Sequence, residues 1–238
     1  MTLVGVLIWI QGCRLDIIFA VLYLSWSTTK PRQHHLNMAY YVLRYLRTTI
    51  DIPLVLGGDK SLQATTFSDA SLGTAPKGRS VIGVVNKLNP DSGAISAKAT
   101  AGPNVHLSSF ESELEGMTSN FKSLNRIMNI LTDLNMELIY LLAGIQSLYN
   151  PQGQAYNDNK AMIDFVKGDA VAKGVRHMVL RMWYNKTEYQ KGKIKLDHMS
   201  GKEIPADYLT KPSCKSTHRS FVIAIMGLKL TGVTYFPT

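Results

Sequence analysis

The stretch Thr66-Phe67-Ser68-Asp69-Ala70 decides the fold, because an apolar segment with the composition of a β-strand ends there on an acidic residue. Upstream of it apolar residues recur at helical spacing, whereas from Leu62 onward the period is that of strands. Predicted strands cover residues 62–67, 81–88 and 94–97, with turns rich in Gly, Pro, Asn and Asp between them. This pattern predicts an antiparallel meander.

The segment after the meander predicts alternating helices and strands. Ser108 begins a helix with apolar residues at intervals of three and four, and Ser108 and Glu111 have the spacing of a capping box. Strands are predicted at 154–156 and 193–198, with helical spacing at 175–183 and a short helix at 204–209. Strands followed by strands that alternate with helices indicate an α/β domain.

The N-terminal part is predicted to be helical and apolar. Residues 3–26 contain two apolar helical stretches, and a third helix runs from Pro31 to about Arg47. The apolar run is interrupted by Gln11, Gly12, Arg14 and Asp16, and it is therefore too short to span a membrane. We expect these helices to be buried against protein, and we place a domain boundary at the turn Gly57-Gly58-Asp59-Lys60.

The composition narrows the class of protein. Residues 160–219 contain 13 Lys and Arg against 6 Asp and Glu, so most of the net charge of +9 lies in the last third of the 238-residue chain. Such a basic surface favours a polyphosphate partner, although a solvated surface without any partner has the same composition. Cys13 and Cys214 lie far apart, which argues against a disulfide scaffold or a zinc site and suits a reducing compartment.

Four acidic residues lie where an α/β sheet brings side chains together. Two follow predicted strands, one lies in the first turns of the long helix, and one lies in the last short helix: Asp69, Asp158, Glu113 and Asp207. Carboxylates held close together repel one another unless a cation neutralises them, and Mg²⁺ prefers oxygen ligands of this kind.

Each of these residues has an ordinary structural alternative. Asp69 and Asp158 are also typical turn residues, Glu113 would favour the positive N-terminus of its helix, and Asp207 would serve as a solvated surface acid. The residues alone leave these alternatives open.

Short motifs recur in a fixed order along nearly the whole chain. They are Leu3-Val4-Gly5, residues 14–21, Pro31 with His35, residues 42–49 (VLRYLRTT), Phe67-Ser68-Asp69-Ala70, residues 107–113 (LSSFESE), residues 158–162 (DNKAM), Arg176-His177, residues 206–212 (ADYLTKP) and Met226-Gly227-Leu228. In this order they resemble the ribonuclease H region of copia-type LTR retrotransposon polyproteins, preceded by the end of the reverse-transcriptase connection. The ordered series is far more specific than any one motif.

The resemblance implies an α/β ribonuclease H-like fold, with a mixed central sheet flanked by helices. Residues 1–58 would form a helical connection or tether from the reverse transcriptase, 59–212 the ribonuclease H-like domain and 213–238 a C-terminal tail. Asp69, Glu113, Asp158 and Asp207 would hold two Mg²⁺ ions, with Mn²⁺ as the alternative ion. Glu111 also matches the motif, but its spacing from Ser108 assigns it to the helix cap.

The implied activity is hydrolysis of the RNA strand of RNA–DNA hybrids during reverse transcription. His198 would assist proton transfer or product release, with an ordinary strand-end histidine as its alternative. The implied partners are the hybrid and the reverse-transcriptase domain of the parent polyprotein, with no membrane. The implied location is the cytoplasm, within virus-like particles, with the nucleus as the alternative.

Some segments depart from the family pattern. Leu15 replaces a proline, Ser71 and Leu72 replace an acid and a tryptophan, and residues 97–103 replace a motif with tryptophan and lysines. These departures keep a second hypothesis open, namely a degenerate, non-catalytic retroelement fragment that retains the fold and binds nucleic acid. A strand-transfer enzyme of the integrase type would need a three-acid arrangement and a zinc-binding leader, and the sequence indicates neither.

Overall fold

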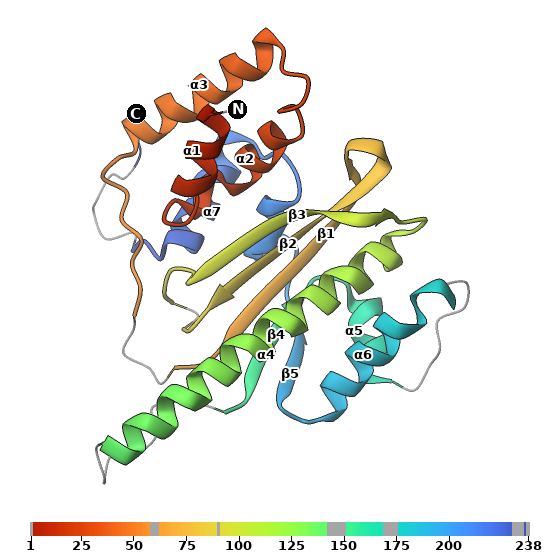
Figure 1. Cartoon of the computed structure of the whole chain (residues 1–238). Helices are drawn as coiled ribbons and strands as arrows, with labels where there is room; N and C mark the ends of the chain where they lie inside the picture. The colour runs from red at the N-terminus through yellow and green to blue at the C-terminus, as the bar shows by residue number, and fades with distance from the viewer. Residues whose placement is uncertain are drawn as a thin grey trace.

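The computed structural model describes residues 2–57, 62–89, 91–141, 151–168, 176–229 and 236. The described residues form a five-stranded sheet in the order β3-β2-β1-β4-β5 (Figure 1). Its strands are β1 (Thr65–Ala75), β2 (Arg79–Lys87), β3 (Ser96–Val105), β4 (Gly153–Asn157) and β5 (Ile194–His198). β1, β2 and β3 pair antiparallel, whereas β4 pairs parallel with β1 and with β5. The predicted α/β class with a mixed central sheet is confirmed.

The prediction that Asp69 ends a strand is wrong. β1 continues to Ala75 because its antiparallel ladder with β2 extends through Asp69, which pairs with Gly83. On its other side β1 pairs with β4 only as far as Ser68 opposite Asn157. Asp69 therefore lies in the middle of its own strand but at the point where the neighbouring strand ends.

β3 is also longer than the four residues predicted for it. It covers Ser96–Val105, and it pairs with β2 from Ser96 opposite Asn86 to Val105 opposite Arg79. This segment includes residues 97–103, where the sequence departs from the family pattern. Ala97 and Ala99 of this segment pack against the apolar cluster that the C-terminal part of the chain shares with the sheet.

One face of the sheet is covered by α4 (Ser109–Leu141), which crosses it diagonally in Figure 1. Leu114, Met117, Phe121 and Leu124 recur every three or four residues, and all four are fully buried. α5 (Lys160–Lys167) and α6 (Val179–Gln190) contribute to the same core. The sequence predicted α4 and the first five residues of α6, up to Trp183, but not α5.

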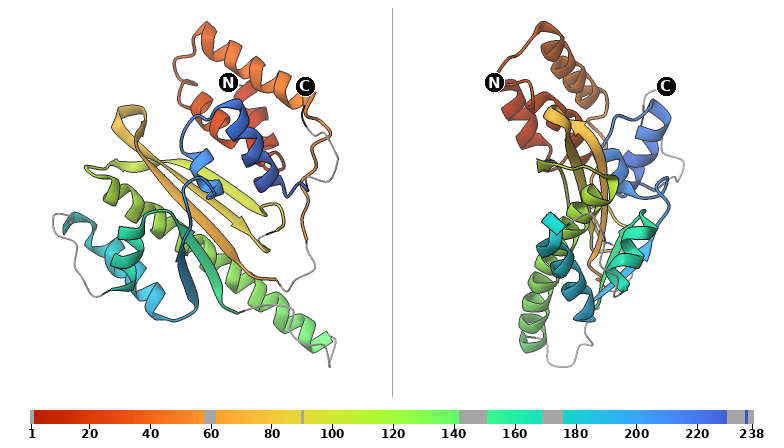
Figure 2. Two further views of the ribbon diagram at one scale, coloured as in Figure 1. Left: turned by 180° about the vertical axis from the view of Figure 1, so that it is seen from behind. Right: turned by 90° about the vertical axis from the view of Figure 1, so that its right-hand side faces the viewer.

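The opposite face is covered by the C-terminal part of the chain, as the two views of Figure 2 show. The 3-10 helix η4 (Pro205–Leu209) lies against β1 and β2, and α7 (Lys215–Met226) packs beside it. Phe221, Val222 and Ile225 of α7 are buried with Phe67 and Val85 of the sheet. The predicted tail 213–238 thus includes a packed helix, because its apolar residues complete the core on this face.

The N-terminal residues form α1 (Thr2–Ile10), η1 (Leu15–Ile17), α2 (Ile18–Ser25) and α3 (Gln33–Thr48). These helices have a small core of their own, but Leu15, Ile18 and Ile52 belong to the core that α7 shares with the sheet. The predicted boundary at residues 58 and 59 lies outside the described residues, and packing connects the two sides of it. Every helix in the described ranges is too short or too polar to cross a membrane.

Hydrogen bonds also connect the N-terminal segment to the rest of the chain. The amide of Val55 donates to the carbonyl of Met226 at 2.8 Å, and the carbonyl of Val55 accepts from the amide of Gly93 at 2.7 Å. Tyr45 of α3 contacts His218 of α7, with 3.2 Å between the phenol oxygen and Nε2.

These contacts predict that deleting residues 1–58 destabilises the protein. The deletion removes Leu15, Ile18 and Ile52 from a shared core, and loss of one large buried aliphatic side chain alone costs about 2 to 5 kcal/mol. We expect a lower thermal midpoint and less soluble protein than for the full chain, measured by circular dichroism and by yield. A truncated protein that is as stable as the full chain would instead support an independent domain from residue 59.

Candidate metal centre

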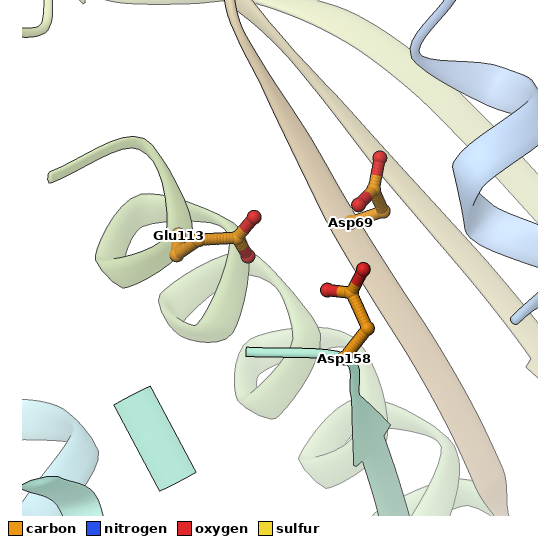
Figure 3. A group of neighbouring side chains, drawn as sticks. All are labelled: Asp69, Glu113 and Asp158. Carbon is orange, nitrogen blue, oxygen red and sulfur yellow. The ribbon is translucent and has the colours of Figure 1, made fainter. Parts of the chain in front are cut away.

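Asp69, Glu113 and Asp158 form the acidic cluster (Figure 3). One carboxylate oxygen from each lies within 4.8 Å of those from the other two. Asp69 comes from β1, Glu113 from the second turn of α4 and Asp158 from the residue after β4, so three separate elements meet at this point. Asp69 and Glu113 are buried and Asp158 is half-buried.

Two glycines allow the surrounding elements to approach Asp69. At Gly116 of α4 a Cβ would lie 3.5 Å from the Cβ of Ala70, so the helix lies directly on β1 beside Asp69. At Gly83, which pairs with Asp69, a Cβ would lie 2.7 Å from the carbonyl oxygen of Ala206. Any larger residue at position 83 would push η4 away from the sheet, and Asp207 with it.

Asp207 lies beside the acidic cluster but is not one of the three residues whose oxygens group within 4.8 Å. Its negative charge raises the pKa of both Asp69 and Asp158 by repulsion, after the larger effect of burial. Its carboxylate forms an ion pair with Lys211, four residues later in the chain. Of the four predicted ligands, the structure therefore brings three together and places the fourth next to them, paired with a lysine.

Thr210 and Lys211 contact the site, although the sequence did not single them out. The Thr210 hydroxyl is buried and donates to Oδ2 of Asp69 at 2.5 Å. The Lys211 ammonium opposes the rise in the pKa of Asp69 and of Asp158 through its positive charge. Both residues lie in the same matched motif as Asp207, residues 206–212, and this position is the signal that could have identified them.

Burial determines the protonation of the acidic cluster. It raises the pKa of Asp69 to about 6, with repulsion from Asp158 and Asp207 adding to the rise and the Thr210 hydrogen bond opposing it. It raises the pKa of Glu113 to about 8, with further repulsion from Asp69. Burial also raises the pKa of Asp158. In the absence of a cation, the fold therefore favours protonated carboxyl groups at this site.

His198, the last residue of β5, lies at the exposed edge of the site. Its Nε2 is 3.0 Å from the carbonyl oxygen of Asp158. The following loop is also close, because a Cβ at Gly201 would lie 2.9 Å from Oδ2 of Asp158. The position next to Asp158 is compatible with the predicted role of His198 in proton transfer, which stays a prediction.

Glu111 occupies the helix cap that its spacing predicted. The backbone amide of Glu111 donates to the Ser108 hydroxyl oxygen at 3.3 Å, and the Glu111 carboxylate accepts from the amide of Leu107 at 2.9 Å. The two acids of the motif therefore have different surroundings, since Glu111 contacts the backbone and Glu113 belongs to the acidic cluster.

The mixed sheet, with α4 on one face and acidic residues where β4 ends beside β1, defines an α/β ribonuclease H-like fold. The chain is similar in sequence to retrovirus-related Pol polyproteins of copia-type transposons. It is 28% identical over 220 residues to the polyprotein of transposon RE2 from Arabidopsis thaliana, covering 92% of this chain and 14% of the relative. It is also 28% identical over 210 residues to the polyprotein of transposon TNT 1-94 from Nicotiana tabacum, covering 87% of this chain and 15% of the relative. The resemblance found in the sequence is confirmed.

The chain spans only 14% and 15% of the length of these two relatives. No protein-family model matches it. Among solved structures it is similar to the N-terminal RNase H domain of rv2228c from Mycobacterium tuberculosis, with a TM-score of 0.42, 12% identity and coverage of 66% of this chain and 99% of that domain. It is also similar to a foamy viral protease-reverse transcriptase in complex with RNA/DNA hybrid. The TM-score is 0.42, the identity is 11%, and the match covers 74% of this chain and 25% of that one.

The raised pKa values predict a pH-dependent response of stability to Mg²⁺. Asp69 and Glu113 titrate at about 6 and about 8 in the folded protein, above their ordinary 3.8 and 4.5. Between the ordinary and the raised pKa value of each group, the folded chain keeps a proton that the unfolded chain releases. Without metal, the free energy of unfolding therefore falls as the pH rises from the ordinary to the raised values. A bound cation replaces those protons. Mg²⁺ should therefore raise the thermal midpoint more at about pH 8 than at about pH 5.

Thermal unfolding followed by circular dichroism, in chelator and in millimolar Mg²⁺, measures this difference. Asp69→Asn should stabilise the metal-free protein at the higher pH, because it removes a buried charge, and should reduce the effect of Mg²⁺. An equal Mg²⁺ effect at both pH values would contradict the prediction.

Proposed function

We propose that the chain is a Mg²⁺-dependent endonuclease of the ribonuclease H type that cleaves the RNA strand of RNA–DNA hybrids during reverse transcription. The observation that carries this proposal is the meeting of Asp69, Glu113 and Asp158 within 4.8 Å, from three separate elements of a ribonuclease H-like sheet. The similarity to retrovirus-related Pol polyproteins from transposons also supports it.

The acidic cluster has the chemistry of a divalent-cation site. Its oxygens are hard donors, and within the described residues none of the three carboxylates forms an ion pair with a side chain. Asp69, Glu113 and Asp158 would hold Mg²⁺, with Asp207 as the fourth ligand and Mn²⁺ as the alternative ion. Two such ions, when bound, would activate a water molecule and stabilise the leaving oxygen of a phosphodiester.

The surrounding residues prepare the site for a phosphate. The hydrogen bond from Thr210 fixes one oxygen of Asp69 and so limits rotation of the carboxylate. Lys211 keeps a positive charge beside Asp207, where it attracts a phosphate group of the substrate. Nε2 of His198 donates its proton to the carbonyl oxygen of Asp158. Because the ring is exposed, Nδ1 can exchange a proton with substrate or solvent.

The basic residues of the last third differ in whether their side chains are available to bind a nucleic acid. Several are occupied within the protein: Lys186 is buried and donates to the carbonyl of Gly168, Arg181 lies 3.7 Å from Glu115, and Lys191 pairs with Glu188 at 2.5 Å. Lys160 is exposed two residues after Asp158 and forms no ion pair among the described residues. Lys173 lies outside the described residues.

The proposal includes the reverse-transcriptase domain of the same polyprotein as a partner. α1 and α3 leave apolar side chains exposed, with Trp9 81% and Tyr41 69% accessible, and a neighbouring domain would cover them. The cytoplasm, within virus-like particles, is the proposed location, with the nucleus as the alternative.

Asp158→Asn should abolish Mg²⁺-dependent cleavage of an RNA–DNA hybrid and leave the fold intact. Asparagine keeps the shape of the side chain but removes the charge that holds the cation. Asp133→Asn, at an exposed acid on α4, is the matched control and should cleave as the unmodified chain does. Hybrid binding without any cleavage by the unmodified chain would instead favour the degenerate, non-catalytic fragment.

Lys160→Glu should weaken binding of the hybrid. Each phosphate contact that is lost reduces the dependence of log affinity on log salt by about 0.7 to 0.9. Fluorescence anisotropy at several salt concentrations measures both the affinity and this slope. Lys30→Glu, an equal charge change at an exposed position among the N-terminal helices, serves as the control. Equal effects of the two substitutions would show that only the net charge matters.

A further inference from the structure

Asn157, the last residue of β4, is fully buried between the elements that carry the acidic cluster. Its side-chain amide Nδ2 donates to Oε2 of Glu113 at 3.1 Å and to the carbonyl oxygen of Ser68, also at 3.1 Å. Its Oδ1 accepts from the backbone amide of Asn159 at 2.8 Å. One side chain thus contacts the residue before Asp69, the residue after Asp158, and Glu113 itself.

The backbone of Asn157 connects the same elements. In the sheet it pairs with Ser68 of β1 and with His198 of β5. Its carbonyl oxygen accepts from the amide of Met199 at 3.1 Å, at the start of the loop that follows His198. A second buried asparagine, Asn120 of α4, supports this arrangement by donating to the Ser68 hydroxyl at 2.9 Å.

We propose that Asn157 is a positioning residue, which holds the carboxylate of Glu113 toward Asp69 and Asp158 for cation binding. This inference rests on the nuclease function proposed above. A neutral amide suits this position because it orients a carboxylate without cancelling its charge. A lysine or arginine would neutralise Glu113 and compete with the cation, and an aliphatic residue would leave a buried carboxylate without a donor.

The structure offers a matched control in Asn185 of α6. Asn185 is also fully buried, and its Nδ2 donates to the carbonyl of Leu114 at 3.2 Å and to the Thr118 hydroxyl at 3.1 Å. Both asparagines therefore bind α4 from a neighbouring element with the same kind of side chain. Asn157 differs from Asn185 in that it contacts an acid of the cluster.

The experiment compares Asn157→Leu with Asn185→Leu in the full chain. Leucine has nearly the shape of asparagine but no polar group, and Asn157→Ala is made alongside it as a smaller replacement. Mn²⁺ binding is measured by electron paramagnetic resonance and Mg²⁺ binding by calorimetry, both without nucleic acid. Thermal midpoints are recorded for all variants, and kcat and KM are measured on a hybrid.

Loss of a residue that orients a metal ligand typically weakens metal affinity about 10- to 100-fold. We expect an effect of this size for both Asn157 variants, with a lower kcat and an unchanged KM for the hybrid. Asn185→Leu should lower the thermal midpoint and keep the metal affinity of the unmodified chain. Asn157 variants with unchanged metal affinity would overturn the proposal, as would an equal loss in Asn157→Leu and Asn185→Leu.

The proposed function fails in a different way. An unmodified chain that binds the cation and does not cleave the hybrid would overturn the nuclease function, while the comparison of metal affinities still decides the role of Asn157. An unmodified chain that binds neither Mn²⁺ nor Mg²⁺ would overturn both.

Discussion

Repulsion among buried carboxylates is the constraint on which the rest of this structure depends. Asp69, Glu113 and Asp158 lie within 4.8 Å of one another in surroundings that favour their neutral forms. Such an arrangement opposes folding unless the scaffold is held by other interactions or a cation binds. Most of the contacts near the site can be understood as a response to this repulsion.

Two kinds of contact hold the carboxylates in place. Close backbone packing is the first, since Gly83 and Gly116 let η4 and α4 lie directly on the sheet beside Asp69. Neutral hydrogen-bond donors are the second, since Thr210 binds Asp69 and Asn157 binds Glu113 without cancelling their charge. A rigid site whose carboxyl groups can all ionise when a cation binds is the arrangement that a divalent cation requires.

The ends of the chain complete the scaffold. α7 covers one face of the sheet, and Leu15, Ile18 and Ile52 extend the same core toward the N-terminal helices. These segments keep η4 in place, and η4 carries Asp207 and is followed by Thr210. The helices before residue 58 and after residue 212 therefore contribute to the position of the acidic residues, although none of them contains a residue of the acidic cluster.

The sequence by itself determined the fold class, the long helix α4 and the ordered motifs that contain all four acids, because periodicity and motif order are local properties of the chain. It did not determine the length of β1, the packing of α7, or the roles of Thr210, Lys211 and Asn157. Those depend on neighbours that are distant along the chain: Thr210 and Asp69 are 141 positions apart, and Asn157 and Glu113 are 44 apart. Only tertiary structure decides such contacts, because a hydrogen bond depends on distance in space and no local pattern of residues encodes it.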